Sequence, residues 1–133
     1  MRRQQIAGNG FLIDLEKHRR YLRAYVHGGQ DSVEVSMGYW RAVAEACRVY
    51  EVQRLLVVED LLPYQPQEED FERVIEMTRR EGLDQVQVAY TSSQAPVGLN
   101  EMGVIVGMEK GMWMRVFASE RDASFWLGVQ GHD

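Results

Sequence analysis

The side chains of this chain that could do chemistry together are mostly carboxylates. Glu59 and Asp60 follow a short apolar run, and Glu68, Glu69 and Asp70 come soon after them. Paired carboxylates can act as acid and base or hold a divalent cation, and open α/β sheets bind ligands at the carboxyl ends of their strands. Acidic residues in the first turn of a helix also stabilise its dipole. We favour helix capping and solvation for the acidic edge of Glu59, Asp60 and Asp70, because nothing else in the sequence supplies a nucleophile or a metal partner.

Histidine and serine add no recognisable catalytic set. His18, His27 and His132 show no pair at a spacing that suits a metal ion, and we expect three unrelated surface histidines. Ser92 and Ser93 could form a phosphorylation site or a small anion-binding turn, although ordinary loop chemistry explains them as well. The sequence contains no nucleophile elbow and no phosphate-binding loop. We therefore expect no enzyme activity, no catalytic residues, no metal and no cofactor.

The composition is that of an ordinary globular domain. The 133 residues are 45% apolar and 26% charged, which suits one domain with its own core. A net charge of −5 repels nucleic-acid phosphates, so we expect no nucleic-acid partner. The single cysteine, Cys47, lies in an apolar helical pattern, which favours a buried thiol in a cytoplasmic protein. No signal-peptide-like run opens the sequence, and the apolar stretch 103–108 is too short for a membrane span.

The segment 97–109 is the most unusual part of the sequence. It has a helical pattern, yet Gly103, Gly107 and Gly111 recur every four residues, and an interior glycine costs a helix about 1 kcal/mol relative to alanine. This cost indicates that something approaches the glycine side closely: the domain's own sheet, a second copy, a ligand tail or a partner helix. With the loop before it, the segment supplies the candidate interaction or ligand-binding residues, which are Ser92, Ser93, Asn100, Met102, Gly103, Gly107 and Met108.

Alternating strand and helix patterns predict an α/β fold with a single domain. We expect a flexible lead-in at 1–9, a domain at 10–128 and a tail at 129–133. The predicted strands lie near 10–16, 20–27, 54–58, 86–90 and 113–117, and the predicted helices near 36–50, 67–82, 97–109 and 119–127. The order is β-β-α-β-α-β-α-β-α, which favours a mixed, mostly parallel sheet with an N-terminal hairpin.

Three stretches resemble the SpoIIAA-like, or STAS-like, domain family. They are Tyr39-Trp40-Arg41 with Cys47-Arg48, RLLVVEDL at 54–61, and MRVFASERDASFWL at 114–127. The resemblance covers residues 10–128 and implies the fold of that family, with small bacterial proteins of unassigned role as the nearest relatives. Family members that antagonise anti-sigma factors carry a phosphorylatable serine after the third strand. The matching stretch here, 59–70, contains no serine or threonine, which argues against that phosphorylation switch.

Two functions fit these observations. The first is a non-enzymatic protein-interaction or regulatory module that binds a protein partner or itself, as a homodimer, through the predicted third helix. The alternative is a domain that binds a small molecule or a lipid in a crevice between that helix and the sheet. Missing side chains at Gly103 and Gly107 would admit a small apolar ligand there.

Overall fold

The protein folds around one six-stranded sheet. The computed structural model describes residues 1–93, 97–130 and 133, and the side chains of all of these except 97–100. The strands are β1 (Arg2–Gly8), β2 (Phe11–Lys17), β3 (Leu22–Gln30), β4 (Arg54–Leu62), β5 (Gln87–Ser92) and β6 (Met114–Phe117). The helices are α1 (Val33–Tyr50), α2 (Glu68–Arg80), α3 (Val97–Glu109) and α4 (Glu120–Leu127), with a 3₁₀ turn at Leu83–Gln85.

The strands lie in the sheet in the order of the chain. β1, β2 and β3 pair antiparallel, whereas β3, β4, β5 and β6 pair parallel, which makes the sheet mixed as expected. The flexible lead-in predicted at 1–9 is wrong, because Arg2–Gly8 is a strand. The predicted order of elements therefore lacks this first strand. The antiparallel part therefore has three strands. β1 gave no apolar alternation to detect, since its side chains are exposed except for the half-buried Ile6.

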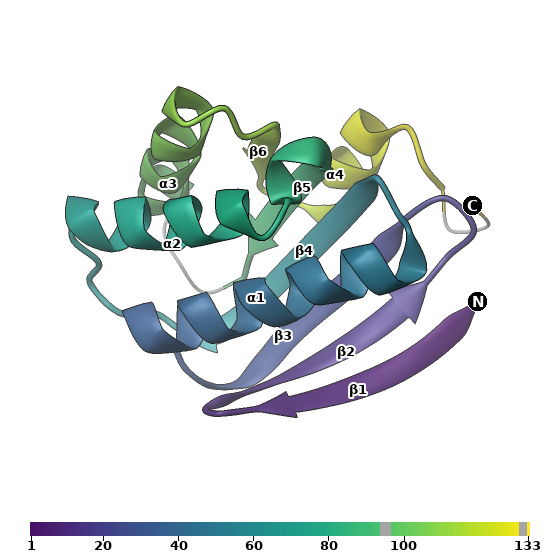
Figure 1. Ribbon diagram of the computed structural model, residues 1–133, viewed down its shortest axis with the longest axis horizontal. Coiled ribbons are helices and arrows are strands. Elements are labelled where there is room, and N and C mark those ends of the chain that lie inside the picture. The colour runs from purple at the N-terminus through teal and green to yellow at the C-terminus, as the bar shows by residue number, and fades with distance from the viewer. Residues whose placement is uncertain (94–96, 131–132) are drawn as a thin grey trace.

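Helices cover the two faces of the sheet unequally. Figure 1 shows α1 and α2 lying across one face, with α3 beside α2. Their buried side chains join those of β2, β3, β4 and β5 in the larger core cluster. On the other face α4 contacts β4, β5 and β6, where Ala123 and Leu127 pack against Leu56 and Ala89. Alternate residues of β4 therefore serve different cores, as the period of a strand requires.

Two helix starts differ in how well the sequence predicted them. α1 begins earlier than expected, because Ser32 and not Ser36 is the N-cap, and the Ser32 hydroxyl accepts from the Val35 backbone N–H at 3.0 Å. α4 begins as predicted after Ser119, whose hydroxyl accepts from the Asp122 backbone N–H at 3.2 Å. Because α1 begins earlier, Ser36 lies within the helix, where its side chain is buried.

The segment predicted as a tail, 129–133, contacts the rest of the domain through Val129 and Asp133. Val129 is buried in the core beneath α4, and the Asp133 carbonyl accepts from the Arg20 backbone N–H at 2.6 Å. The described helices include none whose length and hydropathy would let it cross a membrane.

Candidate functional site

A half-open cavity lies where α1, α2 and α3 meet the carboxyl ends of β3, β4 and β5. Its volume is about 100 Å³. Residues from the strand ends, from all three helices and from the segment between β4 and α2 line it, namely Asp31, Ser36, Tyr39, Trp40, Glu59, Pro63, Tyr64, Pro66, Asp70, Phe71, Val74, Ile75, Tyr90, Gly103, Val104 and Met114. Ligands of parallel sheets bind at this edge.

Five aromatic side chains form much of the cavity wall. Tyr39 and Trp40 come from α1, Phe71 from α2, Tyr90 from β5, and Tyr64 from the segment between β4 and α2. The rings of Tyr39 and Trp40 have centroids 5.4 Å apart, and those of Trp40 and Tyr90 are stacked at 6.0 Å. These contacts join three of the five rings into one polarisable surface.

The carboxylate of Glu59 lies at the bottom of the cavity and is only 2% exposed. Glu59 shares its face of β4 with Val57 and Leu61, which points its side chain into the larger core. Its Oε1 accepts from the Leu61 backbone N–H at 2.8 Å, and its Oε2 accepts from the Tyr90 hydroxyl at 2.8 Å. Burial, and the nearby negative charge of Glu59, hold the pKa of the Tyr90 hydroxyl well above its usual value, so this hydroxyl remains a donor.

Asp31 brings a second carboxylate to the cavity from the link between β3 and α1. Its Oδ1 accepts from the Ser36 hydroxyl at 2.7 Å and from the Ser32 backbone N–H at 2.8 Å. Burial raises the pKa of Asp31 to about 6, and the negative charge of Glu59 acts in the same direction. Burial likewise raises the pKa of the Tyr64 hydroxyl to about 12.

Gly103 and Gly107 of α3 face the domain's own helix α2 and strand β6. A side chain at Gly103 would place its Cβ 3.1 Å from the Phe71 ring, and one at Gly107 would place it 2.5 Å from the Met114 sulfur. Gly103 lines the cavity, whereas the space beside Gly107 is filled by Met114 and Ile75. The crevice expected along both glycines is therefore open only at Gly103, and the close approach needs no second copy of the chain.

Of the remaining predicted site residues whose side chains the structure describes, Asp70 alone lines the cavity. Asp70 also caps α2, since its Oδ2 accepts from the Gln67 backbone N–H at 3.0 Å. Asp60 belongs to the opposite face of β4, where it accepts from the hydroxyls of Tyr25 at 2.7 Å and Ser93 at 2.6 Å. Ser92 ends β5 and is half-buried.

On α3, three apolar side chains face outward, and one predicted site residue is not described. Met102 and Met108 are 48% and 61% exposed, and Ile105 between them is 57% exposed. The side chain of Asn100 lies outside the described residues. The predicted site residues thus divide among the cavity, the far face of the sheet and the outer side of α3.

Sequence reasoning missed most of the cavity wall. The predicted site residues do not include Asp31, Tyr39, Trp40, Phe71 or Tyr90. One signal was available: Asp31 and Tyr90 stand at the carboxyl ends of strands that adjoin β4, so parallel pairing puts them near Glu59.

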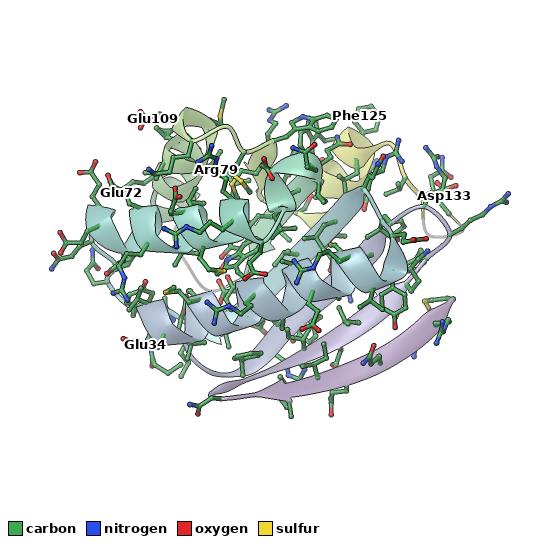
Figure 2. All side chains as sticks on the ribbon, in the orientation of Figure 1. Glu34, Glu72, Arg79, Glu109, Phe125 and Asp133 are labelled. Atoms are coloured by element: carbon green, nitrogen blue, oxygen red, sulfur yellow. The ribbon has the colours of Figure 1, made fainter. Side chains whose placement is uncertain are left out.

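Charged side chains lie on the outside of the same helices. Figure 2 shows Glu34, Glu72, Arg79 and Glu109 projecting from the outer sides of α1, α2 and α3, and all four are exposed. The outer sides of α1 and α2 are therefore charged, whereas that of α3 carries Glu109 beside exposed apolar side chains.

The histidines differ from the expectation of three surface residues. His18 is only 9% exposed and lies 3.1 Å from a Glu16 carboxylate oxygen, while the half-buried His27 lies 2.9 Å from an Asp14 oxygen. His132 lies outside the described residues. Within the described parts of the chain, no group of three or more His, Cys, Asp or Glu residues is arranged to hold a metal ion.

No family model matches the chain, and no curated protein matches it.

Proposed function

We propose that this domain is a non-enzymatic binding module of the SpoIIAA-like type whose cavity holds a small, largely apolar organic molecule. The observation that carries the proposal is the half-open cavity walled by five aromatic rings, with two hydrogen-bonded carboxylates inside it. Small-molecule sites in proteins are typically concave and mostly apolar, with a few placed polar groups that orient the ligand.

The size of the cavity suits a small ring or a short chain. An apolar cavity of about 150 Å³ in another protein binds benzene. The cavity here has about 100 Å³ and a mouth open to solvent, so one end of a ligand fits inside while the remainder extends outward. The carboxylates of Glu59 and Asp31 accept from neutral donors, and no histidine, lysine or cysteine is among the described lining residues. This set favours binding over acid–base or nucleophilic chemistry.

A titration with benzyl alcohol, followed by amide NMR shifts, tests this function. The probe is neutral, and one end of it fits inside the cavity, so we expect the largest shifts at the amides of Tyr39, Phe71 and Gly103. Val104 lines the cavity, and Val104→Trp fills it, so this variant is expected to lose the shifts. Ile105→Trp places the same ring one residue further along, on the outer side of α3, and is expected to keep them.

Two results would overturn the proposed function. One is the absence of saturable shifts in wild type at high millimolar probe. The other is saturable binding that maps to the outer side of α3 or to the far face of the sheet. The wild-type shift map decides the matter even if Val104→Trp fails to fold.

Partner binding through α3 is a second candidate, supported by one observation. Met102, Ile105 and Met108 form an apolar stripe on the outer side of α3, and methionine-rich stripes adapt to varied partners. Sedimentation of wild type and Ile105→Asp at micromolar to millimolar concentration tests self-association, the simplest form of this function. A wild-type protein that remains monomeric, as the variant does, counts against a homodimer.

A further inference from the structure

The charges inside the cavity do not balance. Asp31, Glu59 and Asp70 contribute carboxylates, and the described lining residues include no lysine, arginine or histidine. The donors that do reach Glu59 and Asp31 are hydroxyls and backbone N–H groups, all of them neutral. Within the part of the chain that the structure describes, the cavity thus gathers carboxylates with no cation beside them.

The far face of the same sheet is arranged differently. There the Arg23 guanidinium donates to both carboxylate oxygens of Glu120 at 2.9 and 3.0 Å, and to Glu16 at 3.3 Å. Two partly buried carboxylates on that face, Glu16 and Glu120, thus have a cation beside them. Since taking a charge out of water is costly unless it is paired, the unpaired carboxylates in the cavity leave a place for a positive charge.

The aromatic wall favours a cation as well. The faces of Trp and Tyr rings attract ammonium groups, and the attraction strengthens where water is excluded. The Tyr90 hydroxyl donates to Glu59, the Tyr90 ring stacks with Trp40, and Tyr39 lies tilted against Trp40. The aromatic rings thus adjoin the carboxylate that would attract the cation. Two carboxylates would repel an anion in the same place, and a neutral molecule would leave them without a cation.

We propose that the ligand of this cavity is a small organic ammonium ion, with its nitrogen facing Asp31 and Glu59 and its apolar part against the aromatic wall. This inference rests on the proposed function and names the class of molecule that the site takes. Scaled from the cavity of about 150 Å³ that holds benzene, a cavity of about 100 Å³ encloses about four non-hydrogen atoms of the ligand.

Three probes of nearly equal size test the inference: benzylammonium, benzyl alcohol and benzoate. Calorimetric titrations at about pH 8 keep carboxyl groups of ordinary and moderately raised pKa ionised. We expect benzylammonium to bind at least about tenfold more tightly than benzyl alcohol, and benzoate to show no measurable binding. Equal binding of benzylammonium and benzyl alcohol, or tighter binding of benzoate, overturns the ammonium class but leaves the cavity's function standing. Failure of all three probes overturns both.

Neutral variants of the cavity carboxylates show which negative charge gives the preference for benzylammonium. Asp31→Asn and Glu59→Gln keep their shape and an acceptor oxygen, and each is expected to reduce the preference for benzylammonium several-fold while benzyl alcohol still binds. Asp60→Asn is the matched control, because Asp60 neighbours Glu59 but belongs to the other face of β4. A reduction by Asp60→Asn as large as that by Asp31→Asn would overturn the proposed position of the nitrogen. If Glu59→Gln does not fold, Asp31→Asn decides alone.

Discussion

Among single residues, Asp31 responds most clearly to the environment of the cavity. Burial and the charge of Glu59 raise the pKa of Asp31 from 3.8 to about 6, against the opposing effect of hydrogen bonds from Ser36 and Ser32. A folded-state pKa above the ordinary value means that the folded protein binds a proton which the unfolded chain does not, between about pH 4 and about pH 6. Ionised Asp31 therefore reduces stability when the cavity is empty.

Replacing Asp31 by asparagine removes this titration and keeps an acceptor oxygen for Ser36. Wild-type stability contains a loss that develops as pH rises from about 4 to about 6, and Asp31→Asn lacks it. We expect the variant to match wild type at about pH 4 and to be more stable by about 1–2 kcal/mol at about pH 8, after allowance for solvent screening. Urea unfolding at both pH values measures this, and a variant that is less stable at the higher pH contradicts it.

The sequence indicated part of the site at this scale. Glu59 and Asp70 were recognisable as an acidic edge, because carboxylates follow a buried strand there. The prediction that they only cap and solvate helices holds for Asp70, which does cap α2, and is wrong for Glu59, which is buried. The aromatic wall was not predictable as a wall, since Tyr39 and Tyr90 lie about fifty residues apart and meet only through the strand order.

Among the elements, α3 is the one whose sequence pattern had several explanations. Its glycines predicted a close approach but could not identify the neighbour. The structure shows that the neighbours are Phe71 of α2 and Met114 of β6. The bounds of α3 were predicted correctly, because its helical pattern and the glycine at 111 mark them, whereas the packing depends on side chains elsewhere in the chain.

A double-mutant cycle tests the packing of α3. Gly107→Leu overfills the space beside the Met114 sulfur, so we expect a loss of about 1–3 kcal/mol of unfolding free energy. Met114→Ala opens that space, and the double variant is expected to be more stable than the sum of the single effects implies. Chemical unfolding of the four proteins gives the coupling energy. Additive effects would show that Gly107 and Met114 do not share this space.

Across the whole molecule, the sheet is stable at its centre and weak at one edge. β3, β4 and β5 are paired on both sides and lie in the cores, while β1 pairs only with β2 and is largely exposed. The alternating α/β pattern and the mixed sheet were predictable, because each buried strand and one-sided helix has its own periodicity. β1 was not predictable, because a polar edge strand has no apolar periodicity and forms only by pairing with the open edge of β2.

Amide hydrogen exchange tests this gradient of stability. We expect the amides of β4 and β5 to exchange through global unfolding, the slowest route, and those of β1 to exchange faster by at least about two orders of magnitude through local opening. Mass spectrometry of peptides from labelled protein resolves the strands. Equal protection of β1 and β4 would show that the edge strand is part of the cooperative core, contrary to this description.

The central claim is that the aromatic cavity binds a small organic molecule, and the most direct measurement is where such a molecule lies. Nuclear Overhauser effects between benzylammonium and the isotope-labelled wild-type protein report contacts between ligand and protein protons. We predict effects from the ring protons of the probe to Tyr39, Phe71 and Val104. Effects confined to Met102 and Met108 on the outer side of α3, or none at saturating probe, would contradict the claim.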